Sequence, residues 1–331
     1  MDHPNGEAIT MGLGTRPFKH GLHDLGSGGF AWLQPDGSWG WSNAGLIVDG
    51  DQSLLVDTLF DKALTADMLK AMRRASPTAT GQFDMLVNTH ANGDHCNGNE
   101  LVGGAEIIAS KACAEELAAE NPRMMQIMRE RAPDMGEVGE FFMHCFSTFD
   151  FSDINHVLPT RTFEGELEVN VGDKAVLLKQ VGPAHTAGDV LAYVPDDGLI
   201  FTGDILFIEG HPILWAGPVG NWVAACDYML GLDVETVVPG HGPITDKRGV
   251  QAVRDYLTYI EAESRARFDA GMSAQEAAMD ISLADFDAWG DSERIAVNVS
   301  VLYKEFSGDT EPASTADLFA LMARLHKTRR G

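Results

Sequence analysis

Residues 88–99 constrain this chain more than any other stretch. They gather two histidines, one aspartate and four asparagines around two glycines, directly after the apolar run 85–87. A short β run that ends in polar side chains predicts a strand that delivers metal ligands at its C-terminal edge. His90, Asp94 and His95 supply imidazole nitrogens and a carboxylate, a mixture that suits Zn²⁺ and some Fe or Mn sites.

Composition bounds the kind of protein. The chain has 331 residues with 44% hydrophobic content, enough for a substantial core. No apolar run approaches the length that a membrane span needs, and the polar N-terminus lacks a signal-peptide pattern. We therefore expect a soluble, cytoplasmic protein with no membrane partner.

The net charge limits the class of substrate, and the cysteine spacing limits the kind of cysteine site. The formal net charge is −25, from 49 acidic and 24 basic residues. Such a surface repels phosphate backbones, so we expect a small-molecule substrate and no nucleic acid. Cysteines 96, 113, 145 and 226 are far apart and form no C-x-x-C pair, which predicts small buried thiols. A ligand role for Cys96, next to His95, is the less favoured alternative.

The first half of the chain reads as strands interleaved with helices. An Asp-Gly turn at 36–37 predicts a hairpin between 30–33 and 39–41, and a second antiparallel pair is expected at 44–48 and 53–58. Asn121 is expected to cap the helix that follows it. Further strands are predicted at 84–88, 106–109, 162–169, 175–178, 190–194 and 199–204, and helices at 61–76, 111–120 and 122–132.

Two regions depart from this alternation. Residues 140–154 hold five phenylalanines with neither strand nor helix period, and they form either an irregular hydrophobic contact or the lining of an apolar pocket. From residue 246 onward the pattern is helical, and a capping-box sequence at 273–276 opens one of the helices. These helices could cover the sheet edge, cap the pocket or form a dimer interface.

Three more polar clusters come after strand-like runs, at 185–189, 202–204 and 239–243. Asp57 also closes an apolar strand. It is either a turn cap or an acceptor that orients a ligand histidine.

In order, the four clusters read H-x-N-x-D-H, H-T-x-G-D, T-G-D and P-G-H-G, and together they resemble the metallo-β-lactamase superfamily. That family's pattern is H-x-H-x-D-H followed by a histidine, an aspartate and a histidine. The resemblance covers about residues 28–246 and implies an α/β (α+β) fold, the four-layer αβ/βα metallo-β-lactamase sandwich. We expect one domain over 1–331, with a core at 28–246, a helical and aromatic insert at 110–160 and a C-terminal helical extension at 247–331.

The resemblance also implies two metal positions. Asn92 stands where the family has a histidine, and an amide oxygen is a weaker zinc ligand than an imidazole nitrogen. The first position is therefore weakened, selective for a harder metal, or empty, and we expect one or two Zn²⁺ per subunit, with Fe or Mn as alternatives. Carried over, the ligands are His90, Asn92 and His185 at the first position, Asp94, His95 and His241 at the second, and Asp204 between the two.

These ligands imply a zinc-dependent hydrolase that uses an activated water on a small, largely uncharged ester, thioester or lactone. Asp94, His95 and Asp204 are the catalytic candidates, and Thr89 and Thr186 are candidates to support the ligands. The alternatives are a hydrolytic dehalogenase or sulfatase, an iron-dependent redox enzyme or dioxygenase, and a non-catalytic binding protein with a degraded site. We expect a homodimer.

Histidines outside the four motifs are expected to be structural or on the surface, with His144 and His211 as candidates for the pocket rim. Trp215 and Trp222 are expected to pack in the core or to line the pocket. The histidines without a motif are His3, His20, His23, His144, His156, His211 and His326.

Overall fold

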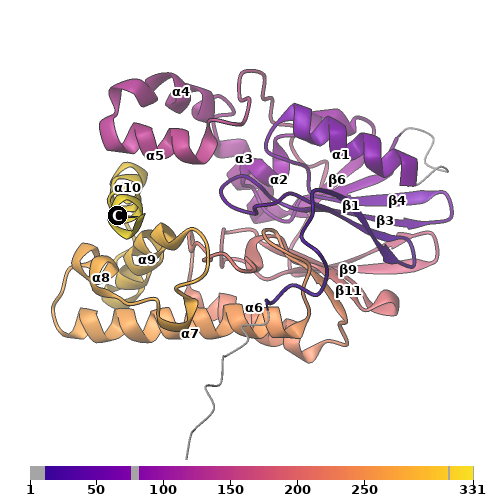
Figure 1. The fold of residues 1–331 in the computed structure, drawn as a ribbon. Coiled ribbons are helices and arrows are strands. Elements are labelled where there is room, and N and C mark those ends of the chain that lie inside the picture. The colour runs from indigo at the N-terminus through magenta and orange to yellow at the C-terminus, as the bar shows by residue number, and fades with distance from the viewer. Residues whose placement is uncertain (1–11, 76–81, 312–313, 331) are drawn as a thin grey trace, which may run out of the picture.

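The computed structural model describes residues 12–75, 82–311 and 314–330. In these ranges two β-sheets lie face to face, and helices cover the outer side of each (Figure 1). The first sheet has the order β1-β2-β3-β4-β5-β6-β7 and the second β12-β11-β10-β9-β8. The strands are β1 Gly21–Gly26, β2 Gly29–Leu33, β3 Ala44–Asp49, β4 Gln52–Val56, β5 Met85–Val87, β6 Glu106–Ser110, β7 Arg161–Phe163, β8 Glu166–Val171, β9 Lys174–Gln180, β10 Val190–Val194, β11 Leu199–Phe201 and β12 Thr236–Val238.

Both sheets change from antiparallel to parallel pairing. In the first, β1 to β4 pair antiparallel and β4 to β7 pair parallel. In the second, β8 to β11 pair antiparallel and β11 pairs parallel with β12. The carboxyl ends of β5, β11 and β12 meet at one edge of the two sheets, and the segments that come after them carry the polar clusters.

Alternating side chains of the strands build the layers. Ile47 of β3 and Leu54 of β4 face the second sheet, where they meet Val190 of β10 in the core between the sheets. Leu46 and Leu55, one residue along each strand, face the opposite way and pack on helix α1 (Lys62–Ala75). The side chains of the second sheet also alternate: one set lies in the core between the sheets, and the other packs on the helices below the sheet. The expected four-layer sandwich is confirmed.

Helices from the C-terminal part share one core with the outer face of the second sheet. The capping box predicted at Ser273 is present, with both the Ser273 and Glu276 hydrogen bonds formed. The helices are α6 Val219–Gly231, α7 Lys247–Asp269, α8 Ala274–Asp280, α9 Ile295–Ser307 and α10 Thr315–Arg330. Figure 1 shows α8, α9 and α10 beside the end of the sheets, below α4 (Met124–Arg131) and α5 (Gly136–Phe146), and α6 beneath the second sheet.

The region between β6 and β7 contains α3 (Lys111–Ala119), α4 (Met124–Arg131) and α5 (Gly136–Phe146). The absence of helical period predicted for 140–154 was wrong up to residue 146. The helix begins at Gly136 and buries Phe141, Phe142, Cys145 and Phe146 at helical spacing on one face, whereas Glu140 and His144 are exposed on the other. A window from 140 to 154 joins the end of this helix to irregular chain and so shows no single period. The predicted cap of α4 was also wrong. Asn121 accepts a hydrogen bond from Arg123 N at 3.0 Å, and the helix begins one residue after Arg123.

The predicted hairpin at 36–37 was wrong as well. β2 pairs with β1 on one side and with β3 on the other, and residues 34–43 form the long connection between β2 and β3. The turn is real, but its second arm is not a strand. The pair β3 and β4 is antiparallel, as predicted. Across the described ranges no helix combines the length and the apolar character that crossing a membrane requires.

Candidate metal centre

The predicted ligands come from segments that lie just after the strand ends. His90 lies three residues after β5, and Asp94 and His95 lie in the single turn α2 (Gly93–Cys96). His185 lies in the loop from β9 to β10, Asp204 in a 3₁₀ turn after β11, and His241 after β12. The structure brings all of them to the same edge of the sandwich.

Asp57 fixes the His95 ring. Its Oδ2 lies 2.9 Å from His95 Nδ1 and accepts the Thr89 hydroxyl at 2.7 Å, while its Oδ1 accepts Thr89 N at 2.7 Å. Because the carboxylate accepts the Nδ1 proton, His95 Nε2 keeps a lone pair for a metal. Burial raises the pKa of Asp57, although His95 acts against this rise. The structure thus favours the orienting role over a plain turn cap.

The other three rings are held in the same way. His185 Nδ1 donates to the carbonyl of Ile213 at 2.6 Å, and His241 Nδ1 donates to the carbonyl of Gly37 at 3.0 Å. The Thr89 hydroxyl, which donates to Asp57, accepts from His90 Nδ1 at 3.0 Å. Each imidazole therefore turns its Nε2 toward the centre, and backbone or hydroxyl oxygens determine which tautomer it adopts.

The Nε2 and carboxylate atoms form two groups whose members lie within 4.8 Å of one another, one of His90, His185 and Asp204 and one of Asp94, His95 and His241. Asp204 lies between them, with one oxygen 3.1 Å from His95 Nε2 and the other 3.4 Å from His185 Nε2 and 3.5 Å from His241 Nε2.

These atoms fit a metal ion. Among the described residues, His90 Nε2, His95 Nε2 and Asp204 Oδ1 are buried and have no hydrogen-bond partner. Buried polar atoms without partners are costly in a folded protein. Three such atoms within the two ligand groups are explained by cations that accept their lone pairs, and nitrogen with carboxylate oxygen is a donor set that suits zinc.

The charges of the site point the same way. Burial opposes the ionised form of Asp204, but the imidazoles of His241 and His95 outweigh it and hold its pKa well below the ordinary value. Burial likewise lowers the pKa of His241, yet Asp204 and Asp94 raise it to about 9. The carboxylates thus create a field strong enough to hold protons on buried rings, and a divalent cation would displace those protons.

A glycine lets Asp204 reach its place between the two ligand groups. A Cβ at Gly240 would lie 2.0 Å from Asp204 Oδ1 and 2.6 Å from the backbone of Gly203. Only glycine permits this approach, which explains the residue before the ligand in the P-G-H-G motif.

Asn92 is close to its expected partner but shows a different geometry from the other ligands. Its Oδ1 is 2.8 Å from His185 Nε2. Two ligands of one tetrahedral zinc lie about 3.3–3.6 Å apart. Since His185 Nδ1 donates to a carbonyl, its Nε2 is an acceptor, and a turned Asn92 amide would donate to it. The ligand role of Asn92 stays a prediction.

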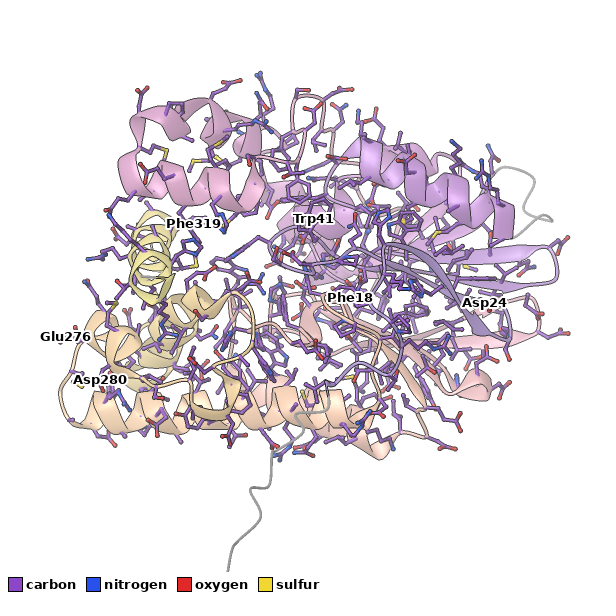
Figure 2. All side chains as sticks on the ribbon, in the orientation of Figure 1. Phe18, Asp24, Trp41, Glu276, Asp280 and Phe319 are labelled. Carbon is purple, nitrogen blue, oxygen red and sulfur yellow. The ribbon has the colours of Figure 1, made fainter. Side chains whose placement is uncertain are left out.

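The centre opens into a cavity of about 540 Å³. Its walls are mostly aromatic and apolar, and the C-terminal helical part contributes Arg294 and Phe319. Figure 2 shows Phe319 on α10, on the side that faces α5. The lining residues outside the metal centre include Trp39, Phe60, Met125, Phe146, Phe207, Ile213 and Trp215.

The remaining residues that the sequence singled out take different places. Trp215 lines the cavity, but Trp222 is core and donates to the carbonyl of Ile205 at 2.8 Å. His211 is buried with its Nδ1 donating to Gly290, and His144 lines a second cavity of about 450 Å³. The Thr186 hydroxyl donates a hydrogen bond to the carboxylate of Asp189.

The four cysteines, all in the described ranges, are buried and form no disulfide, as predicted. Cys96 donates to the carbonyl of His90 and takes no place among the ligand groups.

Sequence reasoning missed Glu120, Arg294 and Phe319 as cavity residues, because none of them lies in a motif. Of the five phenylalanines at 141–151, Phe146 lines the cavity, and all five are buried in the core. Both interpretations of that segment therefore hold in part.

The metallo-β-lactamase superfamily model matches residues 37–241, well over half of the chain. The chain belongs to this superfamily. Superfamily members are generally hydrolases that bind divalent metals, and the ligand groups described above fit that property.

Curated relatives are distant. The chain is 23% identical to a β-lactamase-like protein 2 homolog of Caenorhabditis elegans over 66% of its own length and 61% of the relative's. It is 24% identical to the 2,4-dinitroanisole O-demethylase subunit alpha of a Nocardioides species, over 59% of its own length and 51% of the relative's. The matches thus span less than two thirds of either relative.

Solved structures share the fold. A stereoselective inverting sec-alkylsulfatase from Pseudomonas sp. matches with a TM-score of 0.64 at 14% identity, over 89% of this chain and 52% of that one. A metallo-β-lactamase from Pontibacter korlensis matches with a TM-score of 0.55 at 18% identity, over 72% of this chain and 99% of that one.

Proposed function

We propose that this superfamily member is a zinc-dependent hydrolase of small, largely uncharged organic molecules. The observation that carries the proposal is the pair of ligand groups at the base of a cavity with aromatic and apolar walls. A divalent metal held there lowers the pKa of a bound water to about 7 and so supplies a nucleophile at neutral pH.

The second metal position is the better equipped. Asp94, His95 and His241 provide three ligands there, and Asp204 adds an oxygen 3.1 Å from His95 Nε2. Asp94 Oδ2 is 3.3 Å from His241 Nε2, and its other oxygen can orient the attacking water. The first position has His90, His185 and a share of Asp204, but in place of a third imidazole it has the amide of Asn92.

The cavity lining selects for apolar substrates. Phe60, Phe207 and Trp215 form part of the wall, and charged groups other than the candidate ligands are few among the described lining residues. Ester, thioester or lactone cleavage is the chemistry we favour. A second candidate is hydrolytic displacement of a substituent from an aromatic ring, which the aromatic walls favour and which is in keeping with the aromatic substrate named for the Nocardioides relative.

Metal content and hydrolysis together test the proposal. We expect elemental analysis of protein purified without chelators to give about one zinc per subunit, and metal-loaded protein to hydrolyse aryl and alkyl acetates. His241→Ala should lose both properties. His20→Ala is the control, because His20 is exposed and contacts Trp32 far from the ligands.

Other outcomes revise the proposal in defined ways. Two zinc ions per subunit would mean that the first position is filled despite Asn92. Iron would support the redox alternative. A chain that binds no metal under any loading condition would refute the hydrolase proposal and favour a binding protein.

A further inference from the structure

Hydrolysis of an ester expels an oxygen that needs a proton, and the metal ligands are not free to supply one. Among the described residues that line the cavity, three titratable side chains are not candidate ligands: Glu120, His156 and Arg294. The Arg294 guanidinium lies over the rings of Trp39 and Phe207 and pairs with Asp291, and it serves as a fixed cation and not as an acid. The donor is therefore Glu120 or His156.

His156 offers an acceptor. One of its ring nitrogens donates to the carbonyl of Leu117, while its Nδ1 has no partner among the described residues. Burial lowers the pKa of His156, so the ring is neutral at pH 7, and its single proton is held by Leu117.

Glu120 places a carboxyl on the wall of the cavity. It follows the last turn of α3 as its C-cap, and its N–H donates to the carbonyl of Glu116. This fixes the backbone, whereas the side chain lines the cavity and has no hydrogen-bond or ion-pair partner in the described parts of the chain. The residue is also exposed to solvent, which can return a proton after each turnover.

We propose that Glu120 is the catalytic acid that protonates the leaving group of the hydrolysis described above. The inference rests on the proposed function and adds to it a residue outside the metal centre. Water forms a bond to the acyl carbon, and a proton of that water passes to solvent. The bond from this carbon to the leaving oxygen then breaks, its electron pair stays on that oxygen, and the Glu120 proton completes the alcohol. Solvent then reprotonates the Glu120 carboxylate.

The electrostatic surroundings keep a proton available. Although Glu120 is exposed as a residue, its carboxyl lies against the cavity wall, and this partial desolvation, followed by the charges of Glu116 and Asp94, raises the pKa of Glu120 to about 7. A metal beside Asp94 offsets the last of these causes and leaves the first two. Apart from the candidate metal ligands, Arg294 and the neutral His156 are the other titratable groups among the described residues that line the cavity. A general acid works best with a pKa near the working pH.

Leaving-group dependence tests the assignment. Metal-loaded wild-type, Glu120→Gln and Glu120→Asp proteins are compared on para-nitrophenyl, phenyl and ethyl acetate, and kcat/KM is followed against pH. Para-nitrophenolate leaves without help, but ethoxide needs a proton. We expect Glu120→Gln to lose less than about threefold on the first ester and about 10²–10⁴-fold on the last. The fall in rate above about pH 7, where the carboxyl loses its proton, should disappear in Glu120→Gln and persist in Glu120→Asp.

Glu115→Gln is the matched control, since Glu115 is exposed on the same helix and does not line the cavity. Metal content should be equal in all four proteins. Equal losses on all three esters, or none on ethyl acetate, would overturn the assignment of Glu120 and leave the hydrolase proposal standing. If metal-loaded wild-type protein hydrolyses none of the esters, the proposed function fails and the role of Glu120 fails with it.

Discussion

Replacing Asp57 by asparagine would change which nitrogen of a metal ligand carries the proton. Asp57 Oδ2 accepts from both the Thr89 hydroxyl and His95 Nδ1. Asparagine keeps one oxygen for Thr89 N but puts an NH₂ group in place of Oδ2. An NH₂ group cannot accept the His95 proton, so the ring is driven to the tautomer that carries its proton on Nε2, the atom that faces the metal position.

The expected loss is in metal affinity more than in stability. Partners that orient metal-binding histidines are worth about 10–100-fold in affinity, or about 1.4–2.7 kcal/mol. The metal-free protein should change less, because burial raises the pKa of Asp57 and asparagine removes the cost of that buried charge. Zinc affinity is measured by competition with a chromophoric chelator, and stability by urea unfolding of the metal-free protein.

Asp61→Asn is the matched control. Asp61 is a buried carboxylate that accepts Leu64 N at 2.8 Å and Asp150 N at 3.1 Å, away from the ligands. We expect its zinc affinity to equal that of the wild type. If Asp57→Asn bound zinc within twofold of the wild type, Asp57 would be a turn cap only, and the tautomer argument would be wrong.

Local geometry supports two further predictions. Asn92→His should raise metal content by about one ion per subunit by elemental analysis, because a third imidazole would complete the first position; unchanged content would mean that His185 is not available to a metal. Ser273→Ala should lower the free energy of unfolding in urea by about 1 kcal/mol, since it removes the capping box at α8, without changing metal content; an unchanged midpoint would mean that α8 unfolds before the rest of the chain.

The gathering of these ligand-type side chains could be predicted from sequence because its signals are local. His90, Asp94 and His95 lie within six residues of each other, directly after a strand. Asp204 and His241 also come after short strands, β11 and β12, and parallel pairing brings those strand ends together. A strand-like run that is followed by ligand-type residues can be recognised from the sequence alone.

The loop at 34–43 shows where local signals fail. Asp36 and Gly37 predict a turn, and a turn is present, but long-range hydrogen bonds decide the conformation of the residues after it. The carbonyl of Gly37 accepts from His241 Nδ1, and the Asn43 side chain donates to the carbonyls of Pro239 and Gly242. Because this loop hydrogen-bonds to residues 239–242, it cannot also form a β hairpin. Nothing in the sequence of the loop indicates these long-range bonds.

Arg294 shows the same limit at the cavity wall, and it connects the C-terminal helices to the metal centre. Its guanidinium lies over the rings of Trp39 and Phe207, at 4.5 and 4.9 Å, and Phe207 stacks on the ligand His241 with 5.0 Å between ring centroids. A buried cation is tolerated only where partners surround it, and here the ring faces, Asp291 at 3.0 Å and the carbonyl of His211 do so. Arg294 lies outside the residues matched by the family model, yet its contact with Phe207 connects it to the candidate ligand His241. The C-terminal part of the chain therefore belongs to the site that it encloses.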